Sequence, residues 1–194
     1  MRRLLLAMVL AVLWITPAFA ESSPRDAVLS AREKLDGLTS YHLSLNDGLE
    51  PTDIDFTLPD RVRVTKPESV GLIIGGSTYL NVGNSGWSPA GVNPTLVVLM
   101  TMLRADRLIS VGPEDTVTDE GADVLGGVAA HKYEIRTAVN GGALLRTVWI
   151  GVKDGLPLRV EREGGTSPLT ATYSEFNQDF AIEPPPHAEP MTQH

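Results

Sequence analysis

The residues of this chain that could carry acid–base or metal chemistry are four histidines and a larger set of carboxylates. His42 and His131 fall at alternating positions of apolar runs, whereas His187 and His194 fall in a Pro-rich C-terminal stretch. A histidine at such a strand position is more often a half-exposed side chain than a general base. The sequence has no cysteine, no G-x-S-x-G nucleophile motif and no H-E-x-x-H zinc motif. We therefore predict no catalytic residue, no metal ligand and no cofactor, and expect that the protein is not an enzyme.

The carboxylates fall into two groups. The segment from Pro113 to Asp123 is predicted to be an acidic loop. Its carboxylates are Glu114, Asp115, Asp119, Glu120 and Asp123. Their spacing does not follow the D-x-D-x-D-G pattern, so a solvated loop is favoured over a calcium site. Asp53 and Asp55 alternate along a predicted strand, and Arg61 and Arg63 follow a tight turn. Paired carboxylates can be catalytic, but cross-strand ion pairs with these arginines explain them better.

Apolar and polar residues alternate with a period of two through most of the chain. This pattern predicts antiparallel strands with one apolar and one wet face. Pairs such as Gly-Gly and Asp-Gly separate the runs and act as turn signals. Trp87 is expected in a loop. The expected strands lie near 41–45, 53–58, 61–64, 72–74, 79–82, 130–138, 143–152, 156–163 and 168–175.

One hairpin is especially clear, at residues 147–163. Asp154-Gly155 supplies its turn. If the alternation continues through the second arm, one face of that arm carries Leu156, Leu158 and Val160. The pattern does not assign Trp149 to either face. The hairpin could belong to a closed enzyme fold or to an open sheet whose apolar face holds a ligand.

Helical spacing occurs at two places. Ser23 is the predicted N-cap of a helix at 24–36, with Pro24 in its first position. A second helix is expected at 94–104, because Asn93-Pro94 is a start signal. Helices inserted into an antiparallel meander predict an α+β fold, with one strongly curved sheet wrapped around helices. A closed lipocalin-like barrel is the alternative, but it would not need the central helix.

The helix expected at 94–104 is apolar nearly all round. The residues that share one of its faces are Leu96, Leu99, Met100 and Leu103. A helix of this kind must be covered on most sides. It is either a buried core helix or a helix with one face on the sheet and the other on a replaceable apolar ligand. The methionines suit an adaptable contact surface, and the pattern alone leaves both interpretations open.

The first twenty residues have the features of a secretory signal peptide. Arg2-Arg3 precedes an apolar stretch from Leu4 to Ile15, and Ala18-Phe19-Ala20 is a cleavage pattern. Residues 1–20 are therefore expected to be removed, and a retained membrane anchor is the alternative.

Residues 184–194 are expected to form a disordered Pro-rich tail. A formal net charge of −8 without a basic cluster argues against nucleic acid and against an anionic membrane as partners.

A series of strand-and-turn motifs in this order resembles the LolA/LolB-like superfamily of exported lipoprotein and lipid carriers, including its mycobacterial lipoprotein branch. The motifs are L-P-D-R-V-R-V at 58–64, a Gly-rich strand pair, Trp87, N-P-T-L-V-V-L-M at 93–100, the segments 123–137 and 148–161, and T-A-T-Y-S-E-F-N-Q-D-F-A-I-E-P-P at 170–185. Each motif is weak alone, and their order is moderately specific.

The resemblance implies an unclosed β half-barrel over residues 21–183, with helices filling or lidding its concave face. It also implies an apolar ligand, the acyl chains of a lipid or of a lipoprotein. The residues expected to bind it are Leu96, Leu99, Met100, Leu103, Phe56, Leu72, Ile74 and Trp149. The membrane-anchored branch begins with a lipidated cysteine, which this chain lacks. A soluble periplasmic carrier is therefore the expected function, with an envelope membrane protein as a possible partner. The alternative is an envelope sensory or protein-binding module on the same scaffold.

Overall fold

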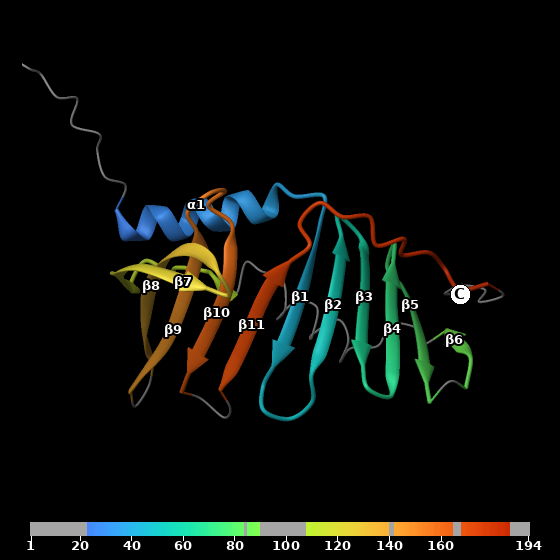
Figure 1. The fold of residues 1–194 in the computed structure, drawn as a ribbon. Helices are drawn as coiled ribbons and strands as arrows, with labels where there is room; N and C mark the ends of the chain where they lie inside the picture. Colours follow the sequence, from blue (N-terminus) through green and yellow to red (C-terminus); the bar gives the residue numbers. More distant parts are fainter. Residues whose placement is uncertain (1–22, 84, 90–107, 140–141, 165–167, 187–194) are drawn as a thin grey trace, which may run out of the picture.

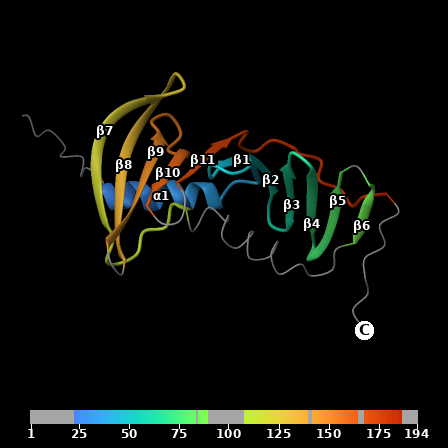
Figure 2. The same ribbon diagram turned by 90° about the horizontal axis from the view of Figure 1, so that it is seen from below.

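The computed structural model describes residues 23–83, 85–89, 108–139, 142–164 and 168–186. They form one 11-stranded antiparallel sheet and a helix, α1, at Pro24–Asp36. The strand order is β6-β5-β4-β3-β2-β1-β11-β10-β9-β8-β7, so β6 and β7 are the two edges and the sheet is not closed. Figures 1 and 2 show that the sheet is strongly curved. The predicted α+β fold with an unclosed half-barrel is confirmed.

Most strands lie where the period of two predicts them. The strands are β1 at Ser40–Asn46, β2 at Thr52–Thr57, β3 at Arg61–Lys66, β4 at Ser69–Ile74, β5 at Ser77–Val82, β6 at Trp87–Pro89, β7 at Thr116–Leu125, β8 at Val128–Val139, β9 at Gly142–Gly151, β10 at Pro157–Glu163 and β11 at Leu169–Ser174. Consecutive strands are neighbours except for β6 and β7, the two edges of the sheet. The pairing of β1 with β11 brings the two halves of the chain together.

The predicted first helix is confirmed together with its N-cap. The Ser23 hydroxyl accepts a hydrogen bond from the Asp26 N–H, at 3.2 Å, which satisfies one of the donors left free at a helix start. Gly37 follows the last turn and donates to the Glu33 carbonyl. The helix predicted at 94–104 and the signal peptide predicted at 1–20 lie outside the described residues.

Two segments expected to be loops are strands. The acidic segment is largely β7, whose residues pair with β8 along its whole length. Its Thr-Val-Thr start favours a strand, and the acids are tolerated because β7 is an exposed edge, where charges hinder pairing with other chains. Trp87 begins the short edge strand β6 and pairs with Asn81 of β5. Both segments lack strict alternation because little of an edge strand is buried.

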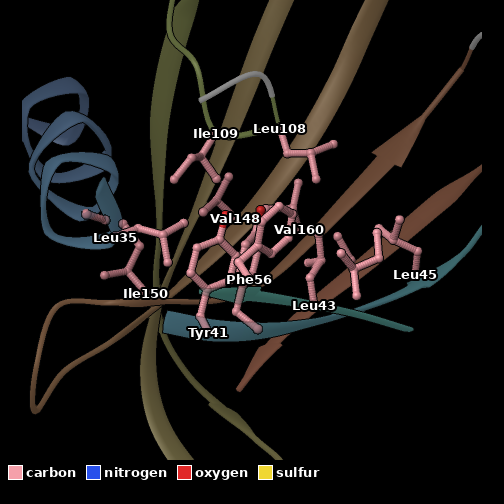
Figure 3. Close-up of a cluster of buried hydrophobic side chains, with 14 of the residues drawn as sticks. Leu35, Tyr41, Leu43, Leu45, Phe56, Leu108, Ile109, Val148, Ile150 and Val160 are labelled. Atoms are coloured by element: carbon pink, nitrogen blue, oxygen red, sulfur yellow. The ribbon is translucent and has the colours of Figure 1, made fainter. Parts of the chain in front are cut away.

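The sheet has two different faces. We call the face that α1 packs against the inner face, and the opposite one the outer face. Val28, Ala31 and Leu35 are the buried residues of α1. Figure 3 shows strand side chains meeting Leu35 in one cluster on the inner face. The inner-face residues of this core are Tyr41, Leu43, Leu45, Ile54, Phe56, Val62, Val64, Tyr133, Ile135, Val148, Ile150, Val160, Ala171 and Tyr173.

Candidate ligand-binding face

Aromatic side chains lie near the middle of the inner face. Tyr41 and Phe56 are paired across β1 and β2 and stack with ring centroids 4.6 Å apart. Tyr173 of β11 lies beside Tyr41, at 6.2 Å. The Tyr173 hydroxyl is buried and has no hydrogen-bond partner among the described residues, and burial raises the pKa of Tyr173. The face is therefore apolar, with one unsatisfied hydroxyl in it.

The apolar inner face extends further along the sheet than α1 does. The helix contacts chiefly β7, β9 and β10, whereas the core continues through β2 and β3 to Ile73 of β4. Cross-strand pairing aligns Phe56, Val62 and Ile73 in one row perpendicular to the strands. This row continues the apolar core into strands with which α1 makes little contact, and its Phe56 and Val62 are themselves buried.

A buried ion pair holds the chain between residues 108 and 115 against the inner face. Arg146 of β9 lies 3.1 Å from the Asp115 carboxylate, and both side chains are less than a tenth exposed. The Arg146 guanidinium also donates to the Ser110 carbonyl at 2.7 Å and to the Thr137 hydroxyl at 3.0 Å. The pair thereby positions Leu108 and Ile109, which enter the core (Figure 3).

The Asp115 carboxylate is stabilised in its charged form. Burial by itself raises its pKa, but the Gly112 N–H, the Thr137 hydroxyl and the charge of Arg146 together outweigh burial, so the pKa of Asp115 is lowered. Arg25 of α1 also binds the 108–115 segment, because its guanidinium donates a hydrogen bond to the Gly112 carbonyl at 2.9 Å. The helix, the segment and the sheet are thus joined by charge-assisted hydrogen bonds.

The outer face carries His42, Asp53 and Asp55, whereas His131 lies opposite Ile150 on the other side of the sheet. His42 Nδ1 lies 2.7 Å from Asp55 Oδ1, and Asp55 Oδ2 accepts from Arg63 at 2.8 Å. His42 Nε2 lies 3.6 Å from Asp53. Asp55 and Arg63 are cross-strand partners, as expected from their spacing. This arrangement is an ion-pair network, and it confirms the ion-pair interpretation for Asp55 and Arg63.

The C-terminal segment crosses the outer face after β11. Its carbonyls accept hydrogen bonds from side chains of the sheet, from Arg63 to Phe180 at 3.3 Å and from Arg61 to Ile182 at 2.8 Å. Figure 1 shows this segment, in red, running past the ends of β1 to β5. Phe180 and Ile182 pack there with Leu72 and Tyr79 in a second apolar cluster. Sequence analysis missed this contact, because nothing local connects residue 182 with residue 72.

Trp149 also lies on the outer face, since it alternates with the inner-face residues Val148 and Ile150. Its indole N–H donates to Asp123 at 2.7 Å. This bond, followed by one from the Val124 N–H, lowers the pKa of Asp123. Lys132 and Arg159 lie over the ring at 5.8 and 5.9 Å, distances at which a cation is attracted to an indole.

The structure therefore separates the residues that were predicted to bind a ligand together. Phe56 lies in the inner-face core. Leu72 and Ile74 lie in the outer cluster, and Trp149 lies between two cations on the outer face. A single site on one face cannot contain all four. The helical candidates Leu96, Leu99, Met100 and Leu103 lie outside the described residues, so ligand contact by this set stays a prediction.

Other kinds of site receive little support from the described part of the chain. It contains no group of three or more His, Asp or Glu that could hold a metal ion. A hollow of about 350 Å³ beside the β3–β4 turn is lined mostly by polar residues such as Lys66, Glu68 and Asn81, which do not suit an acyl chain. None of the described helices is both long and apolar enough to span a bilayer.

Comparison with solved structures shows which fold this is. LprF from Mycobacterium bovis is 16% identical, with a TM-score of 0.66 over 84% of this chain and 96% of that one. The Mycobacterium tuberculosis lipoprotein LppX is 16% identical, with a TM-score of 0.63 over 82% of this chain and 98% of that one. No family model matches the chain, and no curated protein matches it. At this identity the likeness shows a fold shared with LprF and LppX.

Proposed function

We propose that the protein binds acyl chains, of a lipid or of a lipoprotein, on the inner face of its open sheet and carries them outside the cytoplasm. The observation that carries this proposal is the apolar row of Phe56, Val62 and Ile73, which continues the core beyond α1. The shared fold with the lipoprotein LppX supports it. The signal peptide predicted at residues 1–20 would direct the chain to the periplasm.

The energetics of an open apolar face suit a carrier. A sixteen-carbon chain gains roughly 12 kcal/mol gross when it leaves water, at about 0.8 kcal/mol per CH₂. Association and ordering cost about 4–15 kcal/mol, so the net affinity is moderate and the chain can be released. In this proposal Leu96, Met100 and Leu103 cover the chain from the side opposite the sheet. Leu72, Ile74 and Trp149 are left out of the site, because they lie on the outer face.

Two neighbouring isoleucines of β4 offer a matched test. Ile73 packs on the inner-face core and Ile74 on the outer cluster, and both are partly buried. We expect Ile73→Ser to weaken binding of a fluorescent fatty acid about tenfold, the equivalent of 1.4 kcal/mol. Ile74→Ser should leave the affinity unchanged at a similar cost in stability. Equal affinities for the two variants, or a loss only in Ile74→Ser, would rule out the inner face as the site.

Native mass spectrometry tests the cargo directly. Protein purified without detergent should carry the mass of a fatty acid, a phospholipid or a lipidated peptide. A protein that is always free of lipid, does not bind fatty acid and retains a stable protein partner through purification would favour the sensory or protein-binding module. The fatty-acid titration and the mass measurement together decide between the two functions.

A further inference from the structure

The tip of the β7–β8 hairpin has an apolar surface that the core does not use. Val124 and Val128 are 67% and 48% exposed, and Val152 of the neighbouring β9–β10 turn is 63% exposed. Val152 lies next to the hairpin, because its N–H donates to the Ala129 carbonyl at 3.0 Å. Runs of exposed apolar residues are unusual unless they serve an interaction. We call Val124, Leu125, Val128 and Val152 the valine tip.

The valine tip protrudes from the sheet. The last residue of β9 that pairs with β8 is Gly151, opposite Ala130, and Val152 adds one hydrogen bond to Ala129. Residues 124–128 therefore extend beyond β9 and pair only within their own hairpin. Figure 2 shows this hairpin projecting past the neighbouring strands. Gly126 and Gly127 form its turn, both with positive φ, which glycine adopts without strain. The valine tip is therefore an exposed, protruding end of the hairpin.

The charged side chains near the valine tip do not prevent its contact with an uncharged apolar partner. No charged side chain occurs from Val124 to Ala130. The nearest acid, Asp123, accepts hydrogen bonds from Trp149 and from the Val124 N–H. Lys153 lies directly beside Val152. At about 3.4 Å per residue, Val124 and Ala129 lie roughly 7 Å from the turn, within the about 5–10 Å to which peripheral apolar segments enter a membrane interface.

We propose that the valine tip inserts into the surface of a zwitterionic lipid bilayer. Four apolar side chains would enter the interface, with Lys153 at the level of the lipid phosphates. The net charge of −8 opposes an anionic surface and not a neutral one. A second copy of the chain fits this region less well, because pairing of two β7 edges would bring Asp119, Glu120 and Asp123 against their equivalents. The inference goes beyond acyl-chain binding and does not depend on it.

The chain has no cysteine, so a single introduced cysteine can place a fluorophore at one position of the full chain. The test position is Val128→Cys. The matched control is Leu49→Cys, which is 82% exposed in the β1–β2 loop, at the opposite end of the strands from the β9–β10 turn (Figure 1). Both labelled chains are mixed with phosphatidylcholine vesicles, with and without spin-labelled lipid. Because both retain residues 1–22, any binding by that segment affects them equally.

We expect a blue shift and quenching by spin-labelled lipid for the label at 128 and neither effect for the label at 49. Adding Val124→Ser to the 128-labelled chain should weaken vesicle binding about tenfold, since one buried valine is worth about a decade in affinity. A label at Val152→Cys provides a second position if the first alters the hairpin. No response at 128 and 152, an equal response at 49, or a concentration-dependent dimer that buries the label without lipid would overturn the proposal. Fatty-acid binding is titrated on the same proteins, so loss of one property is distinguished from loss of the other.

Discussion

Replacing Asp115 by Asn tests whether the buried ion pair holds the 108–115 segment on the inner face. The substitution keeps the shape of the side chain and removes its charge. The Asp115 carboxylate accepts from the Gly112 N–H at 2.8 Å and pairs with Arg146 at 3.1 Å. Asn cannot replace the charge, so Arg146 would lose its ion pair with Asp115 and, among the described residues, keep neutral acceptors such as the Ser110 carbonyl and the Thr137 hydroxyl.

The magnitude follows from what Arg146 retains. Breaking a buried ion pair by removing one partner costs about 3–5 kcal/mol. Arg146 keeps bonds to the Ser110 carbonyl and the Thr137 hydroxyl, so we expect the lower end, about 3 kcal/mol at pH 7. For a domain of this size each kcal/mol lowers the Tm by about 2–4 °C, which predicts a fall of roughly 6–12 °C.

The pH dependence gives the assay a second readout. The pKa of Asp115 is lowered in the folded protein, so its contribution is complete above the unfolded pKa of about 3.9 and is lost as the pH falls through the folded pKa. Urea unfolding at pH 7 and at pH 3 should therefore show a smaller deficit at pH 3. Glu114→Gln, which removes a charge from the exposed neighbour, should change stability by no more than about 0.5 kcal/mol. A deficit below about 1 kcal/mol at pH 7, or one that does not shrink at pH 3, would refute the reasoning.

Three further substitutions test other contacts by urea unfolding. Ile182→Ala truncates a side chain that is 3% exposed and packs against Leu72 and Tyr79, and it should lower the free energy of unfolding by about 2–4 kcal/mol. A loss as small as that of the exposed Glu183→Ala would mean that the C-terminal segment is not packed on the sheet. Tyr173→Phe removes a buried hydroxyl that has no partner in the described part of the chain and should leave stability unchanged or raise it by up to about 1 kcal/mol; a clear loss would reveal a partner. Gly155→Ala adds a Cβ at φ +70° against the Lys34 side chain and should cost about 1–2 kcal/mol, more than Gly48→Ala at φ +82°, where nothing lies within 4 Å.

Much of the fold could be predicted because it depends on local signals. Alternation indicates a strand wherever one face is buried and the other is wet, which describes β1 to β3. The N-cap of α1 is likewise read from Ser23 and Pro24. The alternation of apolar and polar residues does not indicate the edge strand β7, because residues on both of its faces are largely exposed. There the pairing with β8 determines the strand, and that pairing is a property of the tertiary structure.

A bulge limits prediction in another way. The register between β9 and β10 shifts between Pro157 and Arg159, so the alternation expected for Leu156, Leu158 and Val160 is interrupted. Pro157 is fully buried as a result. A bulge adds a residue to one strand and changes which face the following side chains occupy. No residue type in this arm indicates the shift. The expected faces hold after it, because Val160 pairs with Val148 of the core. They fail before it, where Pro157, and not Leu156 or Leu158, lies opposite Ile150.

For a related reason, the residues predicted to bind one ligand come from both faces of the sheet. Leu72, Ile73 and Ile74 are consecutive apolar residues, and such a run is typical of a strand covered on both sides. The inner side belongs to the core, and the outer side is covered by Phe180 and Ile182, more than a hundred residues later in the chain. Composition indicated that both faces of β4 were apolar but not which one meets a ligand. Only the contact with the C-terminal segment separates them, since it occupies the outer face and leaves Ile73, on the inner face, as the β4 isoleucine in a position to meet an acyl chain.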